Sequence, residues 1–363
     1  MIYNDIRRFS RTISVGDTLI GGKSKIAIQS MTNTDTKDKI ATLEQIKRLA
    51  SAGCDIVRIT VPDEEAAETV RYIKESGLTT PIVADIHFDY RAALKAAEYG
   101  VDKIRINPGN IGGEDRVLAV VNACKAKNIP IRIGVNSGSL EKHILEKHGS
   151  PTPEALCESA LYHAAILEKY DFYDIAISIK SSDVASMIKA NRLVAMSCDY
   201  PIHIGVTEAG DEQSGAIKSA IGVGALLCDG IGDTLRVSLT ADPVREISAA
   251  KEILNALNIE GQCGMNIVSC PTCGRTKIDL ISLSARFKEA VRAEGLEDLP
   301  ITVALMGCIV NGPGEAHEAD IGIAGGVGEA LMFSHGQAIG KISEKEIIPS
   351  LIREIKKIKE ERK

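Results

Sequence analysis

The chain has 363 residues and a net charge of −6, and its 44% hydrophobic and 25% charged residues are ordinary for a globular protein. It contains no Trp and only 4% aromatic residues, which argues against a wide stacking surface for single-stranded nucleic acid. The negative net charge also disfavours a general polyanion-binding surface, so any cluster of arginines must be local and serve a specific purpose.

The beginning of the chain, "MIYNDIRRFSRTISVGD", lacks the apolar segment of a secretory signal. No window approaches the ~18 consecutive apolar residues of a membrane-spanning helix. The nine cysteines are odd in number and scattered, which makes a poor disulfide framework. The sequence therefore predicts a cytoplasmic protein without membrane or nucleic-acid partners. Cysteines in apolar or helical surroundings are predicted to be small buried side chains: Cys54, Cys124, Cys157, Cys198 and Cys228.

The first two-thirds of the chain repeat a strand followed by a helix. Helical stretches such as "TLEQIKRLASAG" and "DYRAALKAAEYG" carry apolar residues at three- and four-residue spacing and end on Gly. Between them lie eight β-rich segments, which are "IAIQSMTN", "IVRIT", "PIVADIH", "KIRINPG", "IRIGVN", "DIAISIK", "IHIGVTEAG" and "TLRVSLT". Eight such units predict an α/β fold of the TIM (β/α)8 barrel type over residues 1–261. An open doubly wound sheet is the alternative, but no G-x-G-x-x-G follows the first strand.

A barrel of this kind builds its active site at the carboxyl ends of the strands. Those ends are polar or charged here, whereas buried barrel strands are normally almost continuous Val, Ile and Leu. In chain order they offer Asn33, Arg58, Asp85 with His87, Arg105 with Asn107, Arg132 with Asn136, Lys180, His203 with Glu208, and Arg236 with Ser238. Guanidinium groups bind phosphate oxygens in bidentate fashion, and Lys adds a compact positive charge. The pattern predicts a small substrate that carries more than one phosphate.

The last hundred residues, 262–363, have a different pattern and form a separate small α+β domain. "IVSCPTCGRTKIDL" leads into a helix, "ITVALMGCIV" is a strand, and "NGPGEAHEADIGIAGG" is rich in turns. The basic C-terminal helix "SEKEIIPSLIREIKKIKEERK" is predicted to be a solvated surface helix.

Three cysteines of this domain, Cys270, Cys273 and Cys308, lie at two loop edges. A structural zinc would need a fourth ligand, and His317 could supply it. A thioredoxin-type disulfide is disfavoured because the pair does not open a helix after the expected strand. Three thiolates could also hold an iron–sulfur cluster, with an oxygen ligand such as Glu315 on the remaining iron. Spacing alone leaves these alternatives open, and Cys263 is taken as structural.

Several motifs along the chain resemble those of the (E)-4-hydroxy-3-methylbut-2-enyl diphosphate synthase family of the non-mevalonate isoprenoid pathway. They run in family order over almost the whole chain: "QSMTNTDT", "VRITVP", "ADIHF", "KIRINPGNIG", "IRIGVNSGSL", "SIKSSD", "HIGVTEAG", "TLRVSLT", "SCPTCGRT" and "MGCIVNGPGEA". The resemblance implies a TIM barrel followed by a [4Fe–4S] domain similar to a module of sulfite and nitrite reductases. No insertion separates the two parts, as in the two-domain bacterial form.

The resemblance also implies residue roles. The cluster ligands fall on Cys270, Cys273, Cys308 and Glu315. The diphosphate is expected to contact Arg58, Arg105, Arg132 and Lys180, with His87, Asn107, Asn136, Arg236 and Ser238 completing the pocket. Glu208 is the candidate proton donor, because loss of a hydroxyl as water requires protonation.

The implied reaction is the two-electron reduction of 2-C-methyl-D-erythritol 2,4-cyclodiphosphate, with flavodoxin or ferredoxin as electron donor. The helix over residues 243–258 would carry the chain ~24 Å away from the barrel mouth before the cluster domain begins. Because the cluster has to contact the bound substrate, this distance favours a head-to-tail homodimer in which each cluster domain covers the partner's barrel. The resemblance implies the same arrangement. Two other interpretations remain: a redox-inert barrel enzyme with a zinc-stapled C-terminal domain, and a non-enzymatic iron–sulfur carrier.

Overall fold

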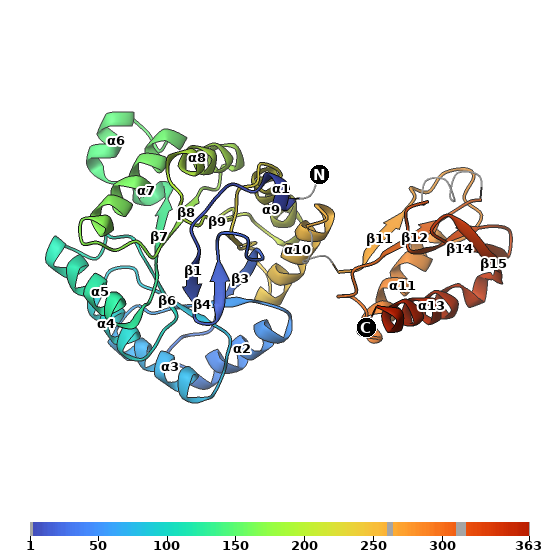
Figure 1. Ribbon diagram of the computed structural model, residues 1–363, viewed down its shortest axis with the longest axis horizontal. Coiled ribbons are helices and arrows are strands. Elements are labelled where there is room, and N and C mark those ends of the chain that lie inside the picture. Colours follow the sequence, from blue (N-terminus) through green and yellow to red (C-terminus); the bar gives the residue numbers. More distant parts are fainter. Residues whose placement is uncertain (1–2, 260–263, 310–316, 363) are drawn as a thin grey trace. The chain divides into compact units, whose positions relative to one another are not determined.

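The computed structural model describes residues 3–259, 264–309 and 317–362. The chain forms two compact units, Met1–Gly261 and Gln262–Lys363 (Figure 1). Within the described ranges, no helix is both long and apolar enough to cross a membrane.

The first unit is a barrel of eight parallel strands. Its strands are β3 (Ala27–Met31), β4 (Ile56–Thr60), β5 (Ile82–Asp85), β6 (Lys103–Ile106), β7 (Ile131–Asn136), β8 (Ile175–Lys180), β9 (His203–Ile204) and β10 (Thr234–Leu235). They are hydrogen-bonded in the order β8-β7-β6-β5-β4-β3-β10-β9. A parallel bridge between Ile177 and Ile202 brings β8 back beside β9. The predicted barrel is confirmed, and the open doubly wound alternative is wrong.

Helices surround this barrel (Figure 1). They are α2 (Lys39–Ser51), α3 (Glu64–Glu75), α4 (Tyr90–Glu98), α5 (Glu114–Lys127), α6 (Lys142–His148), α7 (Pro153–Glu168), α8 (Val184–Ser197), α9 (Glu212–Cys228) and α10 (Pro243–Ala256), with a 3-10 turn at Ser137–Ser139. Six of them begin at an aspartate whose carboxylate accepts a backbone N–H of the first turn: Asp38, Asp63, Asp89, Asp183, Asp211 and Asp242. This capping satisfies donors that the helix itself cannot pair.

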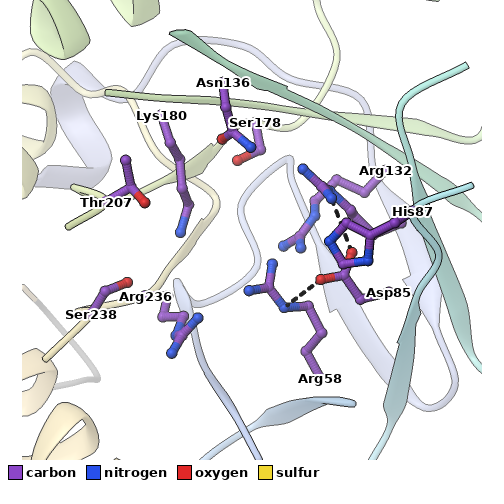
Figure 2. Close-up of a pocket in the computed structure, with 11 residues that line it drawn as sticks. Arg58, Asp85, His87, Arg132, Asn136, Ser178, Lys180, Thr207, Arg236 and Ser238 are labelled. Atoms are coloured by element: carbon purple, nitrogen blue, oxygen red, sulfur yellow. Dashed lines mark hydrogen bonds and ion pairs between the residues drawn. The ribbon is translucent and has the colours of Figure 1, made fainter. Parts of the chain in front are cut away.

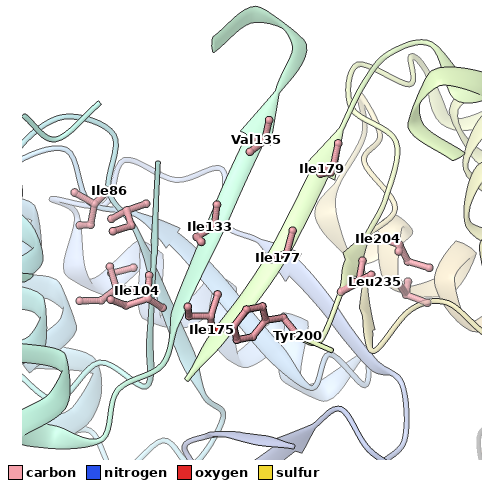
Figure 3. Close-up of a cluster of buried hydrophobic side chains, with 14 of the residues drawn as sticks. Ile86, Ile104, Ile133, Val135, Ile175, Ile177, Ile179, Tyr200, Ile204 and Leu235 are labelled. Carbon is pink, nitrogen blue, oxygen red and sulfur yellow. The ribbon is translucent and has the colours of Figure 1, made fainter. Parts of the chain in front are cut away.

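Polar and apolar residues alternate along the barrel strands. On β7, Ile131, Ile133 and Val135 belong to the main hydrophobic core with the helices, whereas Arg132 and Asn136 line a pocket. Figure 3 shows Ile133 and Val135 on β7 and Ile175, Ile177 and Ile179 on β8 within this core. Since successive side chains of a strand point to opposite faces, the apolar set packs under the helices and the polar set faces the barrel interior.

A β-hairpin that the sequence analysis did not anticipate closes the amino end of the barrel. Its strands are β1 (Ile13–Val15) and β2 (Thr18–Ile20), which pair antiparallel after the short helix α1 (Tyr3–Ile6). Three of its side chains form a buried cluster with residues near the beginnings of barrel strands, namely Ile13, Val15 and Ile20 with Ala27, Ile56, Val83 and Ala176. Burial of this apolar surface excludes water from the amino end of the barrel.

In its described residues, the second unit is a five-stranded mixed sheet with two α-helices. The sheet order is β11 (Asn266–Ser269), β12 (Thr302–Met306), β13 (Ile321–Gly325), β14 (Glu329–Ser334) and β15 (Gln337–Ser343), with a 3-10 turn at Glu344–Glu346. The first three strands are parallel and the last two antiparallel. Helices α11 (Leu280–Ala293) and α13 (Ile347–Glu361) pack on one core with them.

The C-terminal helix differs from its prediction as a purely solvated surface helix. Ile347, Leu351 and Ile355 of α13 are fully buried in the core of the second unit, and only the opposite face of the helix is charged and exposed. Their spacing of four residues forms one apolar stripe, so the helix is an amphipathic part of this core.

Candidate active site

One cavity lies at the carboxyl ends of the barrel strands. Its volume is about 140 Å³, and its wall is almost entirely polar. Figure 2 shows the side chains entering it from different strands; the lining residues are Arg58, Asp85, His87, Arg105, Arg132, Asn136, Ser178, Lys180, Thr207, Arg236 and Ser238. Eight of the residues proposed from sequence as substrate contacts are thus brought together. Ser178 and Thr207 were not anticipated, and Asp85 had been noted only as a strand-end residue.

Asp85, the last residue of β5, joins two of the arginines. Its Oδ1 lies 3.1 Å from Arg105 Nη1, and its Oδ2 lies 3.6 Å from Arg58 Nε. Burial by itself would raise the pKa of Asp85, but the Arg58 and Arg105 charges outweigh this and lower that pKa to about 2. Asp85 is therefore a permanent anion that fixes two guanidinium groups in the pocket wall.

Arg236 is held by a carboxylate on the eighth helix. Glu246 of α10 accepts from Arg236 Nε at 3.0 Å and from Arg236 Nη2 at 2.9 Å. The same carboxylate accepts from the Ser30 hydroxyl at 2.8 Å and from the Leu239 backbone N–H at 3.2 Å. Glu246 is buried, and this bidentate pair fixes the plane of the guanidinium group at the pocket.

Arg132 is the largest fully buried side chain of the chain's described part. Its Nη1 donates to Gln29 Oε1 on β3 at 2.8 Å. Burial and the neighbouring Arg58 and Arg105 charges lower the pKa of Arg132 below its ordinary value. The arrangement concentrates positive charge on one side of the cavity, which favours a bound anion.

A further polar layer lies deeper in the barrel. Lys103 is completely buried, and its Nζ has no hydrogen-bond partner in the described structure. His203, noted from sequence as a strand-end residue, is also buried; its Nδ1 lies 2.7 Å from the Thr234 hydroxyl and its Nε2 has no described partner. Burial together with Arg132 lowers the pKa of both Lys103 and His203 well below their ordinary values. The layer below the pocket therefore favours neutral forms of both side chains.

Two of the proposed site residues do not line the cavity. Asn107 is buried after β6, and its Oδ1 accepts from the Gly109 N–H at 3.0 Å, so it shapes the loop beside the pocket. Glu208 is exposed and follows the pocket residue Thr207. Its backbone has φ +52°, a left-handed conformation that costs a non-glycine residue ~1 kcal/mol or more. Backbone strain of this kind is concentrated at functional sites.

The thiol site lies in the second unit, after the carboxyl ends of two parallel strands. Cys270 follows β11 and Cys308 comes two residues after β12. The Gly307 N–H donates to Cys270 Sγ at 3.2 Å, which brings the two segments together. Hydrogen bonds from the backbone and side chain of Arg275 lower the pKa of the exposed Cys273 thiol. A lowered pKa and an N–H donor both favour thiolates, so these residues fit an iron–sulfur cluster.

The proposed fourth ligand, Glu315, lies outside the described residues, as does Cys263. Among the residues that are described, no group of three or more His, Cys, Asp or Glu side chains converges as a metal site. Of the cysteines predicted to be buried, Cys54, Cys124 and Cys157 are buried and Cys198 is partly exposed. Cys228 is exposed at the end of α9, and the prediction is wrong there because Cys228 lies on the solvent side of the last turn, whereas Leu226 and Leu227 before it are buried.

Comparisons with known proteins match both units. Residues 10–251 match the family model described as the GcpE TIM-barrel domain, and residues 266–357 match the GcpE protein C-terminal domain. A Clostridium perfringens protein named 4-hydroxy-3-methylbut-2-en-1-yl diphosphate synthase (flavodoxin) is 56% identical, covering 97% of this chain and 99% of its own length. A protein of the same name from Fusobacterium nucleatum is 54% identical over 97% of both chains.

A solved structure shares only the barrel fold. The crystal structure of dihydropteroate synthase from Stenotrophomonas maltophilia matches with a TM-score of 0.51 and 14% sequence identity, over 69% of this chain and 98% of that chain. The likeness supports the barrel architecture and carries no information on substrate.

Proposed function

The chain belongs to the GcpE family of flavodoxin-dependent 4-hydroxy-3-methylbut-2-en-1-yl diphosphate synthases, and we propose on this premise how its residues carry out the reaction. The protein is an iron–sulfur oxidoreductase of the non-mevalonate isoprenoid pathway. Its proposed substrate is 2-C-methyl-D-erythritol 2,4-cyclodiphosphate, which takes up two electrons and two protons, opens its cyclic diphosphate and loses one hydroxyl as water. The product is 4-hydroxy-3-methylbut-2-enyl diphosphate.

The observation that carries the proposal is the convergence of four guanidinium groups on one small cavity. Arg58, Arg105, Arg132 and Arg236 line it together with Lys180. A cyclic diphosphate has several oxygens around two phosphorus atoms. Guanidinium groups that project from several strands can donate hydrogen bonds to these oxygens from different directions. His87, Asn136 and Ser238 add hydrogen-bonding groups on the same wall, and Asn107 holds the adjacent loop.

Asp85 and Glu246 keep this cationic wall organised before substrate arrives. Each carboxylate fixes the orientation of one or two guanidinium groups, so little side-chain ordering remains to be done on binding. Preorganised donors of this kind also stabilise charge that develops on the departing phosphate oxygen.

Glu208 is proposed to protonate the departing hydroxyl. It lies next to Thr207, which lines the cavity, and its carboxylate is exposed to solvent from which it can be reprotonated. A hydroxide ion is a poor leaving group, so a positioned acid accelerates this loss.

Cys270, Cys273, Cys308 and Glu315 are proposed to hold a [4Fe–4S] cluster. When bound, the cluster supplies the two electrons of the reaction, delivered to it by flavodoxin or, as an alternative donor, ferredoxin. The Gly307 N–H bonded to Cys270 Sγ and the Arg275 donors at Cys273 stabilise negative charge on the sulfur atoms.

A head-to-tail homodimer is part of the same proposal. Helix α10 follows the strand that ends at the pocket and runs for 14 residues, so it carries the chain ~21 Å toward the amino end of the barrel. A second copy would then bring its thiols to this pocket. Mixing Glu208→Gln chains with Cys308→Ser chains tests this, because activity should reappear only if an intact pocket can use an intact cluster of the other chain.

Anaerobic turnover tests the main proposal. Purified protein with reconstituted cluster should convert the cyclodiphosphate to 4-hydroxy-3-methylbut-2-enyl diphosphate with a chemical reductant. Bound zinc without sulfide, together with no reduction, would instead support a redox-inert enzyme with a zinc-stapled domain. A cluster without tight cyclodiphosphate binding would support an electron carrier.

A further inference from the structure

Lys180 is a buried residue whose side-chain amine lines the cavity. It is the last residue of β8 and is only 8% exposed, and within the described structure its Nζ makes no hydrogen bond or ion pair. Figure 2 shows its side chain reaching into the pocket that Arg58, Arg132 and Arg236 enter from other strands. Gly205, after β9, leaves room beside it: a Cβ at Gly205 would approach Lys180 Nζ to 3.3 Å.

The charges around this amine are mainly positive. Guanidinium groups face it from β4, β7 and the segment after β10. The carboxylate that favours the charged form of the amine, Glu246, already accepts two hydrogen bonds from Arg236. His203, below it, is neutral in this environment. Asp85 and His87 line the same cavity, but Asp85 is paired with Arg58 and Arg105.

This environment disfavours the protonated form of Lys180. Burial, followed by the Arg236, Arg58 and Arg132 charges, lowers the pKa of the Lys180 amine well below its ordinary value. A guanidinium group cannot be deprotonated in practice, whereas a lysine can release its proton and so relieve the repulsion. An amine next to fixed cations is the arrangement that makes lysine a nucleophile in imine-forming sites.

We propose that Lys180 forms an imine with short aldehydes that carry a phosphate group, and that this pocket is thereby a covalent site for phosphorylated aldehydes. The guanidinium groups would hold the phosphate, and the cavity of about 140 Å³ restricts the site to small molecules. Such aldehydes would compete with the cyclodiphosphate for the same arginines.

The step balances without an oxidant or reductant. The Lys180 nitrogen attacks the carbonyl carbon, and the carbonyl oxygen leaves as water with the two protons that the nitrogen loses. The imine then takes up one proton from solvent, and the resulting positive charge lies beside the bound phosphate. The hydroxyl groups of Ser178 and Thr207 line the same cavity and can pass protons to the departing oxygen.

Reductive trapping tests the proposal. The full-length holoprotein is incubated with glycolaldehyde phosphate and cyanoborohydride, digested, and analysed by peptide mass spectrometry. Lys218, an exposed lysine of α9, serves as the reference amine in the same digest. At pH 7, Lys180 should be labelled at least ~10-fold faster than Lys218, because only Lys180 lies in the pocket whose arginines hold the phosphate group. Inorganic pyrophosphate and the cyclodiphosphate should both protect Lys180 and leave Lys218 unchanged.

Two comparisons make the result specific to this site. Glycolaldehyde without phosphate should label Lys180 at least ~10-fold more slowly, because the arginines no longer hold it. Raising the pH from 7 to 9 should accelerate labelling of a free lysine derivative, treated in parallel, by up to ~100-fold and that of Lys180 far less. Lys180→Arg should lose the adduct at this position while keeping the far-ultraviolet circular dichroism of the parent.

Labelling at Lys180 that is no faster than at Lys218, that does not depend on the phosphate group or that rises with pH as steeply as that of the free lysine derivative would overturn the proposal. None of these readouts requires turnover. A protein that traps the aldehyde at Lys180 but does not reduce the cyclodiphosphate would refute the proposed function and leave this inference standing.

Discussion

The pocket of the barrel and the thiol site of the second unit follow the same topological rule but differ in how they are built. Both lie just beyond the carboxyl ends of parallel strands, β4 to β10 in one and β11 and β12 in the other. In the barrel, Asp85, Glu246 and Gln29 hold the arginines in place. At the thiols, backbone hydrogen bonds from Cys270 to Leu305 and from Lys277 to Gly307 join the two segments, together with the Gly307 N–H bond to Cys270 Sγ. Cys273 is exposed beside them.

The two sites therefore differ in how much of their organisation depends on a bound ligand. In the barrel, a large apolar core between the strands and the helices offsets the unfavourable free energy of burying Arg132 and Lys103 in the interior. Its anion site is therefore organised by the protein alone. The small domain has a smaller core and presents thiols that a metal cluster would bring together. Changes at the two sites should accordingly have separable effects on binding and on reduction.

The largest expected effect comes from removing a thiol. Cys308→Ser should abolish reduction, by at least ~100-fold, because even changes around cluster ligands cost ~10- to 100-fold. Cyclodiphosphate binding, measured by calorimetry, should remain if the barrel site is preorganised. Iron and sulfide content should fall together. Cys228→Ser removes an exposed thiol of α9 and should change none of these quantities; a full cluster in Cys308→Ser would refute the ligand assignment.

The next effect separates chemistry from binding within the barrel. Glu208→Gln keeps shape and hydrogen bonding but cannot donate a proton readily, so kcat should fall ~100- to 10,000-fold while substrate affinity stays nearly constant. Glu212→Gln, at an exposed carboxylate paired with Arg245, is the matched control. Lost affinity with an unchanged kcat would assign Glu208 to substrate positioning instead.

A smaller effect is expected from one arginine of the wall. Arg132→Met keeps much of the buried volume but removes a charged contact worth ~1.5–3 kcal/mol, so the Kd for the cyclodiphosphate should rise ~10- to 100-fold. Cluster content should not change, in contrast to Cys308→Ser. Arg245→Ala, which removes an exposed arginine, should leave affinity unaltered. Unaltered affinity in Arg132→Met would place the phosphates elsewhere in the cavity.

The smallest effect concerns the buried Lys103. Its folded-state pKa is lowered, so the unfolded chain binds a proton that the native protein lacks, and stability should rise with pH from that lowered pKa up to about 10.5. Lys103→Met should raise the free energy of unfolding by ~1–3 kcal/mol at neutral pH. It should also reduce the pH slope by up to ~1.4 kcal/mol per unit.

Urea unfolding of this variant between pH 7 and 9 measures both quantities. Lys218→Met provides the exposed control and should change neither the stability nor the slope. If Lys103→Met were less stable than the parent, the amine would have to be held by bound water or an anion within the barrel.

Local sequence patterns were enough to predict the strand–helix repeat of the barrel and the parallel direction of its strands. Alternating residues in "IRIGVN" and "IAISIK" separate an apolar face from a polar one, and aspartates such as Asp63 and Asp211 mark where helices begin. Because each side chain of a strand points opposite to its neighbour, Arg132 and Lys180 could be assigned to the barrel interior and the strand ends to one rim. This was enough to predict eight of the pocket's lining residues.

Contacts across the barrel could be identified only from the folded chain. Gln29 and Arg132 are 103 residues apart and belong to β3 and β7, and Glu246 reaches Arg236 from the following helix. The hairpin at Ile13–Ile20 and the pocket position of Thr207 carried no periodic signal strong enough to identify them. Ser178 shares the interior face of β8 with Lys180, but its small polar side chain did not mark it as part of the pocket. Such contacts depend on strand register and on closure of the sheet, which bring together residues that local spacing cannot relate.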